Sequence, residues 1–210
     1  MPIVGTSLQA AAVSFREHLN GVLHLTITDT PLVVFTVGKN PTKADIAFRH
    51  DGRPQETPLQ TKYGLLWLYL GQVCTSTLDD AGQHVLHTVK YTYTLRRDDE
   101  ENPLLRWEYD KQPGNRYCRH HLQGPIAVPI KRHQHVSLND LHVPTGFVTV
   151  EEVLRFCIVD LKVPSRAPSE RPMAPREPGD HNLHARKTWD EILTESYERF
   201  KSDFAPRGQL

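Results

Sequence analysis

The sequence is poor in cysteine, and it has no long apolar run. Its three cysteines, Cys74, Cys118 and Cys157, are scattered and form no CxxC pair, which argues against a disulfide scaffold and against a cysteine zinc site. Residues 1–20 lack the continuous apolar core of a signal peptide, and the longest apolar run, residues 65–70, is too short to span a membrane. We therefore expect a cytoplasmic protein that does not bind membranes.

Net charge and the common catalytic motifs are also missing. The 25 basic residues balance the 25 acidic ones, so any contact with nucleic acid must come from a local basic patch. The sequence contains no GxxxxGK[ST] phosphate loop, no GxGxxG, no GxSxG and no HExxH motif. These absences disfavour a P-loop nucleotidase, a dinucleotide-binding enzyme, an α/β-hydrolase and a zincin-type protease.

The periodicity of the first 63 residues predicts one helix and a few short strands. Apolar residues recur at helical spacing over residues 7–20, and Gly21 follows as a stop signal. Residues 22–29 alternate in the manner of a strand, and residues 32–37 form a second short apolar run. Residues 38–63 are rich in proline and polar side chains, and they are expected to form a loop around a short strand at residues 46–48.

The middle of the chain predicts an antiparallel meander of strands at residues 65–75, 84–96 and 104–110. Alternation through the second strand places a set of side chains on one face: Val85, His87, Val89, Tyr91, Tyr93 and Leu95. In the third strand, Leu105, Trp107 and Tyr109 would face the core. Arg106, Glu108 and Asp110 would then line the opposite face, as a charged platform.

Short strands at residues 117–122 and 126–130 and a helix at residues 150–161, capped by Thr149, complete the predicted domain. The predicted fold class is α+β: a twisted antiparallel sheet of about four to six strands with helices packed on one face. We assign this domain to residues 1–162.

Two further segments are predicted after the domain. Residues 163–187 are a proline-rich linker, and residues 188–210 form an amphipathic C-terminal helix that opens with a capping box from Thr188 to Glu191. The apolar stripe of this helix must dock on another surface. Docking on its own domain is the simpler interpretation, whereas docking on a second subunit or an antitoxin-like partner is the alternative.

Most of the side chains suited to chemistry lie between residues 106 and 142. Five of the 12 histidines fall there: His120, His121, His133, His135 and His142. Histidine titrates near neutral pH, so it can give and take a proton, and it also binds transition metals. Basic side chains accompany the histidines: Arg106, Arg116, Arg119, Lys131 and Arg132.

Three interpretations of this region compete. Paired histidines flanked by arginine and lysine have the acid, the base and the cations that metal-independent RNA cleavage requires. Alternatively, His133 and His135 with Asp110 or Glu108 could bind zinc or another divalent metal and form a metal-dependent hydrolase. In the third interpretation, the region is a non-catalytic surface that contacts phosphate or a partner protein.

The order of these motifs resembles a family of small bacterial toxins. The strand with Arg106 and Asp110, the His120–His121 pair, the H-x-H segment of His133 and His135, and the helix start at Val150 are similar to the TumE-type toxins of toxin–antitoxin modules. The similarity covers roughly residues 64–161. It implies an RNA-directed, toxin-like or defence role with Arg106, Asp110, His120, His121, His133 and His135 as the site.

The resulting hypothesis is a ribonuclease that uses histidine general acid/base chemistry without a required cofactor, although zinc binding remains an alternative. His120 and His121 are the preferred acid/base pair, and His133 and His135 are further catalytic candidates. Asp110 would orient a histidine. The phosphate would be held by Arg106, Arg119, Lys131 and Arg132.

Overall fold

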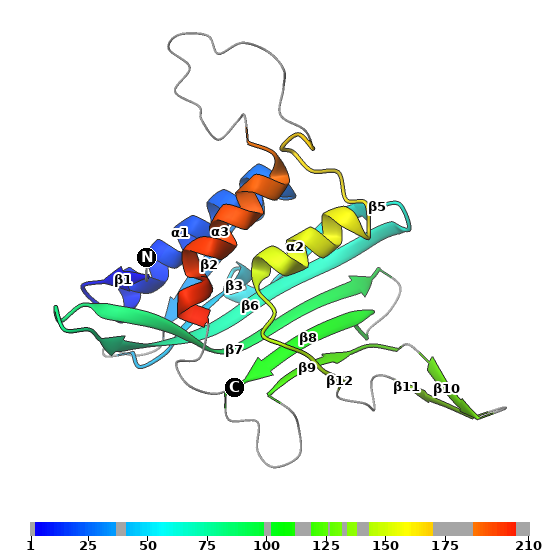
Figure 1. Cartoon of the computed structure of the whole chain (residues 1–210), viewed down its shortest axis with the longest axis horizontal. Coiled ribbons are helices and arrows are strands. Elements are labelled where there is room, and N and C mark those ends of the chain that lie inside the picture. Colours follow the sequence, from blue (N-terminus) through cyan, green and yellow to red (C-terminus); the bar gives the residue numbers. More distant parts are fainter. Residues whose placement is uncertain are drawn as a thin grey trace, which may run out of the picture.

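The computed structural model describes residues 3–36, 41–98, 102–111, 119–125, 127–131, 134–137, 143–169 and 187–204. Side chains are described throughout these ranges except at residues 127–131, 134–137 and 200–204. The expected α+β class is confirmed, because an antiparallel sheet carries helices on one face (Figure 1).

Within the described residues the main sheet has ten strands, more than the sequence predicts. Its central order is β12-β9-β8-β7-β6-β3-β2, with β1 beside β7, β4 beside β3, and β5 beside β6. The strands of this sheet are β1 (Val4–Gly5), β2 (Leu32–Thr36), β3 (Ala44–His50), β4 (Arg53–Pro54), β5 (Thr57–Thr61), β6 (Gly64–Leu78), β7 (His84–Arg97), β8 (Leu105–Asp110), β9 (His120–Gln123) and β12 (Val143–Pro144). The predicted meander is confirmed, since β6, β7, β8 and β9 are consecutive neighbours. The short strand predicted at residues 46–48 is confirmed as part of β3, but the loop predicted around it is wrong in its described part, which also contains β4 and β5.

The first helix is longer than its sequence pattern suggests. Helix α1 (Leu8–Thr26) begins where the sequence predicts, with Ser7 as its cap, but it continues through Gly21, so the strand predicted at residues 22–29 is wrong. Leu19, Leu23 and Thr26 are buried along one stripe, and this burial outweighs the roughly 1 kcal/mol cost of a glycine inside a helix. Tertiary packing therefore decides where the helix ends.

A β-bulge in β7 changes which alternate residues of the strand face the helices. Val73 of β6 pairs with Lys90 and Cys74 pairs with Thr88, so Val89 has no partner in this register. Leu86 before the bulge faces the helices, and so do Tyr91, Tyr93 and Leu95 after it; all four are nearly fully buried. The prediction of a single face for alternate residues 85–95 is therefore wrong for Val85 and His87, because the extra residue reverses the alternation.

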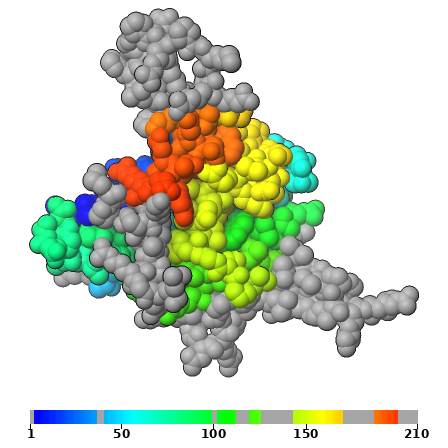
Figure 2. All heavy atoms as spheres, viewed as in Figure 1, coloured from blue at the N-terminus to red at the C-terminus, as the bar shows by residue number. Residues whose placement is uncertain are grey.

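Two C-terminal helices complete the layer above the sheet. Helices α2 (Val150–Val159) and α3 (Trp189–Phe204) pack against each other, α3 also packs on α1, and together they cover the sheet on the side shown in Figure 2. The cap predicted at Thr149 and the capping box predicted at Thr188 are both present, and Thr149 forms a capping box as well. Docking of the tail helix on its own domain is confirmed, since Ile192 and Leu193 are buried in the common core.

The beginning of the predicted linker belongs to this packed body. Val163 is buried, the Arg166 amide donates to the carbonyl of Thr26, and the Trp189 amide donates to the carbonyl of Pro168. Residues 170–186, which contain most of the linker's prolines, lie outside the described residues. No helix in the part of the chain that the structure describes has the length and apolarity that crossing a membrane requires.

Shortening Leu193 tests how much the tail helix contributes to stability. The side chain is fully buried between the helices, so Leu193→Ala should lower the free energy of unfolding by about 2–5 kcal/mol, measured by urea denaturation. Tyr197→Ala changes an exposed residue of the same helix and should stay within about 0.5 kcal/mol of the wild type. Equal, small effects of both substitutions would show that docking of α3 adds little.

Candidate functional site

The two adjacent histidines of β9 lie on opposite faces of the sheet. His120 pairs with Tyr109 and His121 pairs with Glu108, and neighbouring residues of a strand point to opposite sides. His120 therefore belongs to the side that the helices cover, and His121 to the side without helices. The structure does not bring the two rings together on one substrate-accessible surface, as an acid/base pair acting on one phosphate would require.

His120 sits in an aromatic box on the helix side. Its ring stacks on Tyr109 at a centroid distance of 4.3 Å, and Phe147 and Tyr91 lie at 5.4 Å and 6.3 Å. The Nδ1 atom is 3.5 Å from the Tyr91 hydroxyl oxygen, which also accepts a hydrogen bond from the Val148 amide. Burial, followed by the charges of Arg119 and His121, lowers the pKa of His120, so its ring is neutral at neutral pH.

His121 belongs to a charged cluster on the other side. Its Nε2 atom is 3.2 Å from Oε2 of Glu108, and Nε of Arg106 is 3.4 Å from the same oxygen. Arg106 also donates to the side-chain oxygen of Gln123. The exposed fractions decide which groups a ligand could reach: 35% for the Arg106 side chain and 26% for Glu108, but only 9% for His121. Glu108 and Arg106 thus form the accessible layer, and His121 lies beneath them.

Asp110 and Lys90 continue this cluster along the same face. Their side chains are 3.9 Å apart across β7 and β8, and both are more than 40% exposed. The predicted charged platform of Arg106, Glu108 and Asp110 is therefore present. Arg119 is an exposed residue immediately before β9, and its carbonyl accepts a hydrogen bond from the Asp110 amide.

The structure does not describe the side chains of the remaining predicted residues. Strands β10 (Ala127–Lys131) and β11 (Gln134–Ser137) pair only with each other in the described chain, and their hairpin extends away from the main sheet (Figure 1). Lys131 and His135 are on this hairpin, but their side chains lie outside the description. His133, Arg132, Arg116, His142 and Cys118 also lie outside the described residues.

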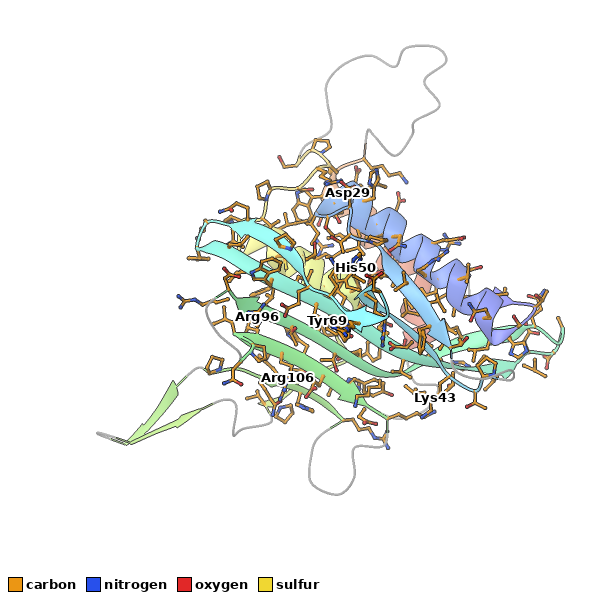
Figure 3. All side chains as sticks on the ribbon, turned by 180° about the vertical axis from the view of Figure 1, so that it is seen from behind. Asp29, Lys43, His50, Tyr69, Arg96 and Arg106 are labelled. Atoms are coloured by element: carbon orange, nitrogen blue, oxygen red, sulfur yellow. The ribbon has the colours of Figure 1, made fainter. Side chains whose placement is uncertain are left out.

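Figure 3 shows the side of the sheet that carries Tyr69, Arg96 and Arg106. We call it the open face, because no described helix packs on it: α1, α2 and α3 all pack on the opposite side. The open face also contains ion pairs. Arg96 pairs with Glu56 at 2.6 Å, and Arg49 pairs with Asp45. Arg49 also lies over the ring of Phe35.

Neither a metal centre nor a thiol nucleophile is evident among the described residues. No group of three histidine, cysteine, aspartate or glutamate side chains in these ranges could hold a metal ion. Cys74 and Cys157 are buried, and burial raises the pKa of each thiol to about 12, so neither supplies a thiolate at neutral pH.

One polar cluster was not anticipated from the sequence. His18 of α1, Glu151 of α2 and Ser196 of α3 meet where the three helices pack together. Nε2 of His18 is 2.8 Å from the Ser196 hydroxyl oxygen, and that hydroxyl donates to Glu151. Because the Ser196 hydroxyl donates its proton to the Glu151 carboxylate, its oxygen acts as the acceptor toward His18. His18 must therefore donate through Nε2–H. Ser196 is 2% exposed, so this cluster ties the helices together rather than meeting a substrate.

The helical spacing of α1 gave a partial signal for this cluster. His18 follows Leu8, Ala11 and Phe15 closely enough around the helix to lie beside the buried stripe, but its two partners are more than 130 residues away. Local sequence cannot reveal such a long-range contact.

Comparison of the chain with protein-family models, with curated proteins and with solved structures finds no match.

The three-helix cluster predicts a specific loss of stability in acid. Burial, and then the charge of Arg199, lower the pKa of His18 from its usual 6.5 to about 4. Between these values the unfolded chain binds a proton that the folded chain does not, so the free energy of unfolding falls as pH falls from 6.5 to 4, by up to about 3 kcal/mol. Burial raises the pKa of Glu151, so the folded chain binds a proton there more readily than the unfolded chain. The Glu151 contribution therefore raises the free energy of unfolding as pH falls, opposite to that of His18.

His18→Gln isolates the histidine contribution, because the amide can still donate to Ser196. Urea unfolding at pH 7.5 and pH 4.5 should show a smaller loss of stability for this variant than for the wild type. His50→Gln, at a histidine whose side chain is 76% exposed, should keep the wild-type pH dependence. If His18→Gln and wild type lose the same stability, His18 is not held neutral by the fold.

Proposed function

We propose that the protein is an RNA-cleaving enzyme of a toxin–antitoxin or defence module, and that its reaction takes place on the open face around Glu108. One observation carries this proposal: Arg106, Glu108 and His121 converge on a face that no described helix covers. A carboxylate beside a histidine and an arginine unites a proton acceptor with a cation for phosphate. The resemblance to TumE-type toxins supports an RNA-directed role.

Each member of the cluster has a distinct role in the proposed reaction. Glu108 accepts the proton of the ribose 2′-hydroxyl, whose oxygen attacks the adjacent phosphorus. Arg106 binds the non-bridging phosphate oxygens, where negative charge develops. His121 acts beneath them as a positioning residue that holds the Glu108 carboxylate.

Lys90 supplies the proton that the departing 5′-oxygen needs. It is a diagonal neighbour of Glu108 across β7 and β8, a spacing of about 7–8 Å, which leaves room for a phosphate between them. Asp110, 3.9 Å from the Lys90 amine, positions that amine. The products are a 2′,3′-cyclic phosphate and a free 5′-hydroxyl, so the reaction requires no metal or oxidant.

This assignment revises the set of residues proposed from the sequence. Arg106, Asp110 and His121 are retained, and Glu108 and Lys90 are added because they share the same face. His120 is not assigned a role in this reaction, because its ring lies in the aromatic box on the other side.

Cleavage of a mixed tRNA and mRNA panel, with and without EDTA, tests the proposal. The wild type should cleave in both conditions and leave cyclic phosphate ends. Glu108→Gln should lower the cleavage rate by roughly 10²–10⁴-fold with an unchanged melting temperature. Glu56→Gln alters a carboxylate of similar exposure, paired with Arg96 outside the Arg106–Glu108–His121 cluster, and should cleave like the wild type.

The other outcomes separate the alternatives. Activity that disappears in EDTA would replace this mechanism with a metal-dependent hydrolase. No cleavage in either condition would contradict the enzyme hypothesis and favour a non-catalytic interaction protein.

A further inference from the structure

Tyr69 lies flat on the open face of the sheet. It precedes Gly71 by two residues in β6, so both residues belong to the same face. A Cβ atom added to Gly71 would lie 2.7 Å from the Tyr69 hydroxyl oxygen and 2.9 Å from Cε1. The ring therefore covers the backbone of Gly71 instead of standing away from the sheet, and the missing glycine side chain is what permits this position.

No other ring occupies the outer side of Tyr69. The residue is half-buried, and among the residues described no aromatic ring stacks on it and no guanidinium lies over it. Its hydroxyl likewise has no hydrogen-bond partner in the described ranges. Burial raises the pKa of Tyr69, so the ring is a neutral phenol at physiological pH. A flat, neutral aromatic surface is thus available to a planar ligand.

Tyr69 is in register with the proposed phosphate-binding residue. Tyr69 pairs with Thr94, and Thr94 pairs with Arg106, which places Tyr69 and Arg106 two strands apart on the same face. The separation of their backbones is therefore about 10 Å. One or two nucleotides of an extended RNA strand can span this separation between a base and a phosphate.

Arg106 is more exposed than Glu108, and Lys90 is more exposed than Asp110, so a phosphate bound at these two ion pairs of β7 and β8 would meet cations first. On the β3 side of Tyr69 the order is reversed, because Asp45 is more exposed than its partner Arg49. The phosphate would therefore lie on the Arg106 side of the ring.

We propose that Tyr69 is a stacking platform for a base of single-stranded RNA whose phosphate is bound by Arg106, an inference that rests on the proposed RNA-directed function. Stacking fits single strands, because their bases can turn out onto an aromatic ring, whereas bases of a duplex are already stacked and paired. Every base has a π-face, so the platform would bind bases with little sequence preference. Tyr69 would thus select single-stranded over double-stranded substrate.

Binding of a short, labelled 2′-O-methyl RNA by fluorescence anisotropy tests this inference without cleavage, because the methyl group blocks attack by the 2′-oxygen. Tyr69→Ala should raise the Kd roughly tenfold, whereas Tyr69→Phe, which keeps the ring, should stay within about twofold. Gly71→Ala should also weaken binding, because the new methyl group displaces the ring while Tyr69 itself is retained. Tyr63→Ala, at a tyrosine 67% exposed in the turn before β6, should leave binding unchanged.

The outcomes distinguish the stacking platform from the enzyme activity. If wild type binds the single strand but Tyr69→Ala and Gly71→Ala bind equally well, the platform is wrong and the proposed function stands. If wild type prefers the matching duplex, the platform is also wrong. If wild type neither binds nor cleaves RNA, the proposed function fails and the platform fails with it. Should Tyr69→Ala not fold, Gly71→Ala alone decides.

Discussion

The unpaired residue Val89 is the constraint on which both faces of the sheet depend. Strands β6 and β7 form the longest pairing of the molecule, and the shift at Val73 and Cys74 reverses the alternation of β7 midway along it. The bulge places Tyr91 and Tyr93 in the core beneath α2, and it places Lys90 on the open face. The Val89 carbonyl has a partner, because the amide of Lys111 just after β8 donates to it. If β7 alternated without the extra residue and Leu86 still faced the helices, Lys90 would also face the helices, and Tyr91 and Tyr93 would face the other side. The bulge therefore allows residues on both sides of it to pack in the same core.

The two faces that result are chemically unlike. The helix side is closed: its polar groups, such as Ser196 between His18 and Glu151, use each other as partners and are shielded from water. Such a network fixes how the helices pack, because any displacement would leave a buried polar group without its partner. The open face has no cover in the described structure, and its polar groups are arranged as ion pairs that remain partly exposed. For this reason the proposed reaction, which needs access to a polymer, is assigned to the open face.

The sequence predicted the elements whose signals are local, and it failed where long-range packing decides. The meander, the cap at Thr149 and the platform of Arg106, Glu108 and Asp110 follow from periodicity within single segments. The helix through Gly21 could not be predicted, because burial against the sheet determines its length. A high density of histidine in the sequence also does not show which of these side chains share a face. Strand geometry separates His120 from His121 by turning successive residues to opposite sides, and it makes Glu108, an acid of unremarkable sequence context, the accessible partner of His121.

The neutrality of the chain also shapes how the open face can bind RNA. The two cations proposed to meet the RNA each have a carboxylate beside them, Arg106 with Glu108 and Lys90 with Asp110. Binding a phosphate there exchanges one ionic contact for another, so fewer counterions are released from the RNA than a basic patch would release. Electrostatics alone would then give weak affinity that falls gently with salt. A stacking contribution from Tyr69 does not depend on counterion release, so it can supply the affinity that the balanced charges do not. A flat ring beside paired charges is thus a consistent way for a protein without net charge to hold a single strand.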